Sequence, residues 1–352
     1  MRGGDKLDLY VGKGWVNIPG ILELGLPFNI IGGGRGTGKT YGAIKYAVEN
    51  NRKFIFMRRT GRVLDAIRSS ALSPFKKYNS DTGLNIGFSR LGSYIDGIYH
   101  LEKDENGKDR PAGNPLGYLL ALSTVANIRG FDASDIDLII YDECVKERHE
   151  KSLKGEGAAF LNAYETINRN RELEGRPPVQ VLALSNSIQL DNPLYIELGI
   201  VKKVESLQRK NQEIYIDRER GLGVFMLYHS PISERKSETA LYKLSGASEY
   251  SRMALGNVFS EVSENAGRRP LAEYRPVVRI GEITIYQHKD AGRGYYVTGH
   301  NSGTPPVFSQ GESDVDRFRR QYRYLWIAYM MNRMGFETSA DELYFRAIFK
   351  DS

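Results

Sequence analysis

The sequence predicts an α/β fold in which a mostly parallel β-sheet carries helices on both faces. Two observations lead to this fold class. Short apolar runs that end in polar residues alternate with helical stretches through the first part of the chain. A glycine-rich turn, Gly33 to Thr40, separates one such run from a helix. Runs that are apolar on both faces are typical of parallel strands covered by helices on both sides.

The predicted strands are short and end in polar or charged residues. They cover Pro27–Ile31, Phe54–Met57, Tyr118–Leu122, Asp137–Tyr141 and Val179–Leu184. Between them, the charged segment Lys103–Asp109 is expected to form a hairpin turn that projects from the core, with Asn106-Gly107 in a type I′ turn. Glu213–Ile216 and Gly223–Tyr228 are expected to form a hairpin that finishes the first domain.

The pattern changes after this hairpin, and three domains are predicted: 1–228, a helical linker at 229–268, and a small α+β domain at 269–352. In the last domain we expect strands in 277–286 and 294–298, then a helix capped by Ser313. An apolar stripe on that helix is predicted to be core, and the arginines beside it form either a solvated face or a nucleic-acid contact. The stripe comprises Phe318, Tyr322, Leu325 and Tyr329, and the arginines are Arg317, Arg319, Arg320 and Arg323.

Composition narrows the class of protein. Cys144 is the only cysteine, which excludes an intrachain disulfide and suggests a reducing compartment. No apolar run is long enough to cross a bilayer, and Met1–Lys6 lacks the apolar core of a secretory signal, so no membrane partner is expected. The net charge of +6 only weakly favours a polyanionic partner.

The turn between the first strand and helix carries the clearest chemistry. Gly33-Gly34-Arg35-Gly36-Thr37-Gly38-Lys39-Thr40 fits the P-loop pattern G-x-x-x-x-G-K-[ST] at every fixed position. Its backbone N–H groups would converge on phosphate oxygens at a helix N-terminus. Lys39 would reach the β- and γ-phosphates, and Thr40 would ligate Mg²⁺. These eight residues and Tyr41 are the predicted ATP-binding residues; the alternative is an ordinary glycine-rich turn.

A second acidic motif points to hydrolysis. The strand Asp137–Tyr141 ends at Asp142, which would hold the Mg²⁺ shell, and Glu143 could polarise a water for attack on the γ-phosphate. The alternative is a helix N-cap, a position that both acids favour. A small-molecule kinase would not need the glutamate, because its substrate supplies the nucleophile.

A third strand ends at Ser185-Asn186. If this strand lies beside the P-loop strand, Asn186 could hydrogen-bond the γ-phosphate or the attacking water. An ordinary Asn/Ser turn is an equally good interpretation.

Arginines at three places are candidates for phosphate contacts. Arg35, inside the loop, could contact the γ-phosphate of its own nucleotide or of a neighbour. Arg169 and Arg171 follow an amphipathic helix, where a guanidinium could stabilise a neighbouring subunit's transition state or simply cap the helix end. The cluster Arg58, Arg59 and Arg62 is either a DNA contact or a solvated turn.

These motifs, taken in order, resemble one family. The basis is the loop 33–40 with its internal arginine, Phe54–Arg59, Ile128–Gly130, Asp137–Glu143, and Leu184–Ser187 followed by Asp191-Asn192-Pro193. The chain is similar to the DNA encapsidation ATPases of small podoviruses, the phi-twenty-nine-like packaging motors. These are relatives of terminase large subunits in the additional-strand, catalytic-glutamate (RecA-like) class of P-loop ATPases.

The resemblance implies a homo-oligomeric ring, expected to be a pentamer, that packages double-stranded DNA through the portal of a procapsid. It implies ATP and Mg²⁺ as cofactors and a place in the host cytoplasm, with transient docking on the procapsid. Arg169 lies where the family has its trans-acting arginine finger, with Arg171 as the alternative. Arg62, or the Arg58-Arg59 pair, lies near the DNA-gripping loop. Members also engage a structural packaging RNA or an equivalent portal adaptor, and the sequence does not distinguish these.

The C-terminal domain resembles a ribonuclease-H-like nuclease that has lost its chemistry. Tyr295–Gly303 is similar to a metal-binding strand and its turn, but His300 or Asn301 stands where an aspartate is expected. Two-metal nucleases need such carboxylates. We therefore expect a vestigial domain without nuclease activity.

The sequence hypothesis is an ATP-driven double-stranded DNA translocase with Lys39, Glu143, Arg169 and Arg35 in catalytic roles. One rival is another phage P-loop motor, a helicase or an export ATPase. A non-motor nucleotide-binding assembly protein and an active nuclease are the others.

Overall fold

A computed structural model describes residues 7–68, 72–128, 133–145, 153, 155–186, 190–245 and 266–349. These residues divide into two compact units. The second unit consists of 266–349 together with 190–191 and 198–206, and the first contains the remainder. Within the described residues, no helix is both long enough and apolar enough to span a membrane.

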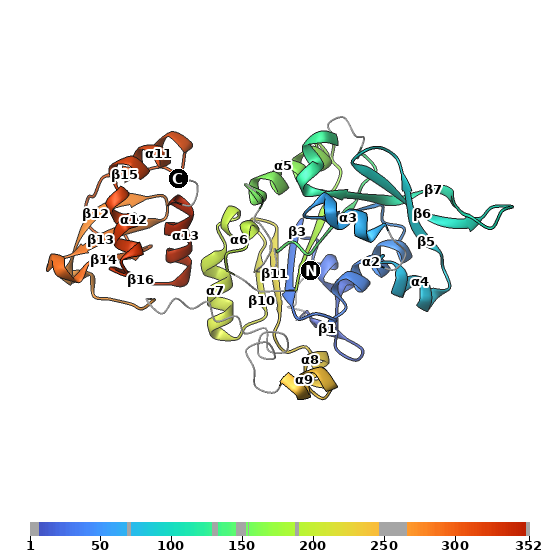
Figure 1. Cartoon of the computed structure of the whole chain (residues 1–352), viewed down its shortest axis with the longest axis horizontal. Helices are drawn as coiled ribbons and strands as arrows, with labels where there is room; N and C mark the ends of the chain where they lie inside the picture. Colours follow the sequence, from blue (N-terminus) through green and yellow to red (C-terminus); the bar gives the residue numbers. More distant parts are fainter. Residues whose placement is uncertain are drawn as a thin grey trace. The chain divides into compact units, whose positions relative to one another are not determined.

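A nine-stranded sheet forms the centre of the first unit (Figure 1). Its six inner strands are parallel, and antiparallel strands complete both edges. In spatial order they are β10 (Ile214–Asp217), β11 (Leu222–Leu227), β3 (Phe28–Gly33), β9 (Gln180–Ser185), β8 (Leu138–Asp142), β4 (Phe54–Arg58), β7 (Asp109–Ala121), β6 (Ile95–Lys103) and β5 (Ile86–Arg90). A small ribbon of β1 (Tyr10–Val11) and β2 (Trp15–Val16) precedes them.

Helices cover both faces of this sheet, which confirms the predicted layers. Residues of the first four helices pack with alternate sheet residues such as Phe54, Phe56 and Ile140. On the other face, the ring of Tyr141 stacks on Phe160 with centroids 4.9 Å apart. The helical elements are α1 (Ile18–Glu23), α2 (Lys39–Glu49), α3 (Gly61–Ile67), α4 (Lys76–Thr82), the 3₁₀ turn η1 (Leu122–Ile128), α5 (Glu156–Asn168), α6 (Pro193–Glu197), α8 (Pro231–Ser237) and α9 (Ala240–Ser245).

The predicted charged hairpin joins β6 to β7, and its tip extends away from the sheet (Figure 1). Asp104 Oδ1 accepts hydrogen bonds from the N–H groups of Asn106 and Lys108, both at 2.9 Å. The expectation of a type I′ turn is wrong, because that turn needs positive φ at both central residues and only Gly107 has it. The five-residue connection is organised by the Asp104 side chain instead.

The second unit is an α+β domain. Its five-stranded sheet has the order β15 (Val307–Phe308), β12 (Tyr274–Ile280), β13 (Ile283–His288), β14 (Tyr295–Thr298) and β16 (Met334–Phe336). The three inner strands form an antiparallel meander, and each edge strand is parallel to its neighbour. The helical elements are η2 (Leu271–Glu273), η3 (Ala291–Arg293), α11 (Glu312–Gln321), α12 (Arg323–Met330) and α13 (Ser339–Phe349).

The predicted C-terminal helix is two helices that meet at Tyr322. Gly311 is the N-cap of α11, so Ser313 lies inside the helix rather than at its cap. The apolar stripe is core, as predicted: Phe318 and Leu325 are fully buried. Arg320 and Arg323 are exposed on the opposite side of these helices.

A segment from the middle of the chain belongs to the second unit. On α7 (Val201–Lys210), Glu205 accepts hydrogen bonds from the N–H groups of Ser339 and Ala340, both at 3.2 Å. Lys202 forms an ion pair with Asp341 at 2.9 Å. A carboxylate on the free N–H groups of a helix N-terminus is favourable, which explains why this part of α7 packs on α13. The predicted first domain, 1–228, includes this segment, whereas α8 and α9 of the predicted linker belong to the first unit.

Candidate active site

The loop between β3 and α2 is organised around the side chain of Lys39. Lys39 folds back so that Nζ donates to the carbonyl oxygens of Gly33 at 2.8 Å and Gly34 at 2.9 Å. Gly36 and Gly38 have φ of +74° and +87°, a region that glycine reaches without steric cost. The strand, loop and helix that the sequence predicts are therefore all present.

Lys39 is buried, and burial has an electrostatic consequence. Its side chain is almost wholly removed from water, which lowers the pKa of Lys39 to about 7 against the opposing pull of the Asp142 carboxylate. Desolvation always disfavours the charged form of a group. A polyanion bound at this loop would restore the ammonium form.

The two motifs meet at the ends of their strands. Thr40 Oγ1 donates to Asp142 Oδ1 at 2.9 Å, and Arg58 Nη2 pairs with Asp142 Oδ2 at 2.8 Å. A hydroxyl and a carboxylate converge here, and these are the oxygen ligands that Mg²⁺ prefers. Thr40 and Asp142 thus fit the predicted metal-binding role.

Glu143 lies one residue beyond β8, with its side chain half exposed and in an ion pair with Arg58. Its φ is +53°, which is rare for a residue with a long side chain. Among the described non-glycine residues, five have positive φ; three are asparagines, and the other two are Glu143 and Arg169. Strained backbone of this kind is concentrated at functional sites.

The predicted third strand is confirmed. β9 lies between β3 and β8 and is parallel to both. Asn186 follows it directly and is partly buried, at the same edge of the sheet as the P-loop and Asp142. This position suits a contact to a phosphate or to water, and its role stays a prediction.

Two of the three arginines predicted to contact DNA are engaged inside the protein. Arg58 pairs with Asp142 and Glu143. Arg59 is 4 % exposed, and its Nε and Nη2 lie 2.5 and 2.9 Å from the two carboxylate oxygens of Glu156, itself 3 % exposed. A DNA contact at Arg58 or Arg59 stays a prediction, and it would require these ion pairs to open.

Arg62 differs from its neighbours. It lies on α3, and its side chain is exposed. It is the member of the cluster that a DNA backbone could reach.

The structure also separates the two candidate arginine fingers. Arg171 is 5 % exposed; it donates to the carbonyl of Pro177 at 3.1 Å and to that of Ile136, and pairs with Asp137 at 3.0 Å. These contacts hold the turn after α5 against the start of β8. Arg169, at the C-cap of α5, is exposed.

Sequence reasoning missed an apolar groove beside the loop. The groove has a volume of about 640 Å³ and is lined mainly by β2, α1 and α2. Trp15 packs so closely on the loop that a Cβ on Gly38 would lie 2.9 Å from its ring. Tyr41, which also lines the groove, donates to Asp81 at 3.0 Å. The sequence signal for this groove was an aromatic residue, Trp15, upstream of the P-loop.

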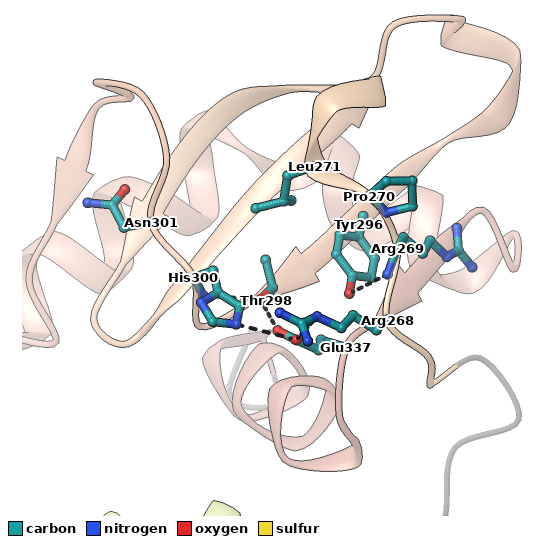
Figure 2. Close-up of a pocket in the computed structure, with 9 residues that line it drawn as sticks. All are labelled: Arg268, Arg269, Pro270, Leu271, Tyr296, Thr298, His300, Asn301 and Glu337. Carbon is teal, nitrogen blue, oxygen red and sulfur yellow. Dashed lines mark hydrogen bonds and ion pairs between the residues drawn. The ribbon is translucent and has the colours of Figure 1, made fainter.

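A polar cluster also occupies the second unit, at the end of β14 (Figure 2). Thr298, at the end of β14, donates to Glu337, which follows the neighbouring strand β16. His300 Nε2 lies 3.4 Å from the Glu337 carboxylate, and Arg268 lies 3.8 Å from it. Asn301 points away from this group (Figure 2). Glu337 was not predicted, because its place beside β14 depends on strand pairing across 39 residues.

Comparisons with known proteins identify the family. The model of the family "Podovirus DNA encapsidation protein (Gp16)" matches residues 109–333, more than half of the chain. A search of the curated proteins found no match. Arg129, Gly130 and Ser187, which contributed to the sequence resemblance, lie outside the described residues.

Two solved structures are similar over nearly the whole chain. The Phi-28 gp11 DNA packaging motor is 17% identical with a TM-score of 0.64, and covers 95% of this chain and 96% of its own. The bacteriophage Phi-29 viral genome packaging motor assembly is 17% identical with a TM-score of 0.62, and covers 96% and 99%. At this identity the likeness shows a shared fold, while the family model shows membership. The chain belongs to the podovirus DNA encapsidation protein (Gp16) family.

Proposed function

We propose that this protein is the ATPase of a phage DNA-packaging motor and translocates double-stranded DNA into a procapsid through the portal. One observation carries the enzymatic part: Thr40 of the P-loop donates a hydrogen bond to Asp142 at the end of β8, and Glu143 follows Asp142 directly. Membership of the DNA encapsidation protein family supports DNA as the polymer that the motor moves.

The groove beside the loop supports a place for the base. It is concave and apolar and has aromatic walls, properties that suit a flat heterocycle. With adenine in this groove near Trp15 and Tyr41, the triphosphate would extend over Gly36 to Lys39. Asn186 and Arg35 would face the γ-phosphate end.

Different residues of this chain have different roles in the proposed hydrolysis of ATP. Lys39 neutralises phosphate charge, and Thr40 with Asp142 would hold Mg²⁺, which spreads the charge of the transferring phosphoryl group. Glu143 accepts a proton from the attacking water. Because Glu143 is paired with Arg58, it must leave this arginine before it can act as a base. Arg169 of the neighbouring subunit stabilises the transition state, so the complete site needs a homo-oligomeric ring, which we take to be a pentamer.

Arg62 is the proposed contact to the DNA backbone. It lies four residues after Arg58 on the same segment, so DNA contact at α3 and the ion pair of Glu143 are close in the chain. We place the working motor in the host cytoplasm, docked on the procapsid, with a structural RNA or a portal adaptor as a further partner. The second unit, with one carboxylate at the Glu337 cluster, is proposed to be a vestigial nuclease domain.

The test is steady-state ATP hydrolysis at several protein concentrations with duplex DNA, single-stranded DNA or neither. We expect stimulation by duplex DNA, an activity that rises more than linearly with protein concentration, and loss of turnover but not of ATP binding in Glu143→Gln. Sustained hydrolysis by Glu143→Gln would refute the assignment of the base. Stimulation by single strands alone would point to a helicase instead.

A further inference from the structure

A second lysine contacts the P-loop, and in the sequence it lies 201 residues after the loop residue that it contacts. Lys236 is in the last turn of α8, which follows β11, the strand beside β3. Its Nζ donates to the carbonyl oxygen of Arg35. A Cβ on Gly36 would lie 2.5 Å from Nζ and 3.1 Å from Cε of Lys236. The ammonium group therefore lies directly on the Arg35–Gly36 part of the loop.

The start of α8 is held independently of this contact. Ser230 is buried and donates to the carbonyl of Gly14 at 3.2 Å. Pro231 packs against the same turn, so that a Cβ on Gly14 would lie 2.7 Å from Pro231 Cβ. The turn between β1 and β2 thus anchors α8, and Lys236 extends from an element fixed at its other end.

The charges around the loop are arranged for an anion. Lys236 is half buried, and desolvation lowers its pKa, with no carboxylate among the described residues acting against the shift. Lys39 is buried in the same loop, where its Nζ donates to the carbonyls of Gly33 and Gly34, so two ammonium groups contact this loop. Two partly desolvated cations beside converging backbone N–H groups gain most from a ligand with several negative charges.

We propose that Lys236 binds the phosphate chain of the nucleotide as a second lysine of the site, from a position that α8 already holds against the P-loop. This inference rests on the proposed ATP site. Lys39 would contact the phosphate chain from its place beside the carbonyls of Gly33 and Gly34. Lys236 would contact it from its place beside Arg35 and Gly36.

The test compares Lys236→Met with Arg235→Met, a matched control on an adjacent exposed residue of the same helix. Methionine keeps the length of the lysine stem and removes its charge. Binding of a fluorescent, non-hydrolysable ATP analogue with Mg²⁺ is measured, together with competition by unlabelled adenosine. We expect Lys236→Met to bind the ATP analogue about tenfold more weakly, Lys236→Arg to recover most of the affinity, and Arg235→Met to match the wild type. Adenosine affinity should be the same in all four proteins.

The outcomes separate the inference from the proposed function. ATP affinity unchanged in Lys236→Met, or an equal loss for ATP and adenosine, would overturn the phosphate role, because a helix that merely supports the groove would affect both ligands. A wild-type protein that binds no ATP would overturn the proposed ATP site and this inference with it. A thermal melt of each variant checks that α8 remains folded.

Discussion

The buried ion pair between Arg59 and Glu156 predicts a large loss of stability when either partner is removed. The two groups form a bidentate contact at 2.5 and 2.9 Å, and Tyr141 donates a further hydrogen bond to Glu156 at 3.2 Å. Removal of one partner leaves an uncompensated charge in the protein interior, which costs about 3–5 kcal/mol. For a unit of this size, that corresponds to a decrease in melting temperature of roughly 6–20 °C.

The assay can report on the first unit alone. The chain has two tryptophans, Trp15 in the first unit and Trp326 in the second. In a Trp326→Phe background, the fluorescence of Trp15 follows unfolding of the first unit. We would compare Arg59→Met, Glu156→Leu and the double variant by urea and thermal unfolding, with Arg62→Met as an exposed control.

Each single variant should lose about 3–5 kcal/mol. The double variant buries no charge and should lose far less than the sum of the two. Additive losses, or a single variant that unfolds like the wild type, would refute the argument. If Arg59 contacted DNA instead, Arg59→Met would weaken duplex binding while leaving the unfolding curve unchanged.

Three further predictions concern function. Arg62→Ala should weaken duplex binding and reduce its salt dependence by about one phosphate contact without changing the unfolding midpoint; unaltered binding in a salt titration would exclude Arg62. Arg169→Ala and Glu143→Gln should each be inactive as ATPases. Mixing the two variants should restore activity, because a mixed ring contains interfaces with one intact Arg169 and one intact Glu143. A mixture that stays inactive would contradict an arginine finger that acts in trans. The pKa of Lys39 is near 7, so Lys39 is largely neutral at about pH 8.5, and a bound polyphosphate should recharge it with uptake of close to one proton. Calorimetry in buffers of different ionisation enthalpy measures this uptake, which should fall toward zero as the pH decreases below 7, and no uptake at the higher pH would refute the shift.

Features encoded over a few neighbouring residues could be predicted from the sequence. The apolar runs that became β3, β4, β8 and β9 have the length and the two-sided burial of central parallel strands. The P-loop has its strand, its positive-φ glycines and its helix in consecutive positions. The apolar stripe through Phe318 and Leu325 followed helical spacing and is buried.

Features that depend on distant partners could not be predicted. Arg59 and Arg62 look alike in sequence, but the partner that buries Arg59 lies 97 residues away in α5. The sequence places α7 in the first domain, but Glu205 accepts hydrogen bonds at the start of α13, more than 130 residues later. Lys236 lies on a polar helix far from the P-loop in sequence, and the pairing of β11 with β3 and the contact of Ser230 with Gly14 bring it there.

The segment after β4 shows why one cluster of like residues can carry several roles. Arg58 pairs with Asp142 and Glu143, Arg59 is anchored to the first turn of α5, and Arg62 is exposed on α3. The anchored residue lies between the other two. Because Arg169 is the C-cap of α5, the Arg59–Glu156 pair also joins the segment that pairs with Glu143 to the helix that carries the proposed finger. Arg62 and Arg58 therefore lie on either side of a fixed point, and Arg58 is the residue whose release of Glu143 we propose to precede hydrolysis. This arrangement leads us to expect that duplex DNA raises the rate of the chemical step rather than the affinity for ATP.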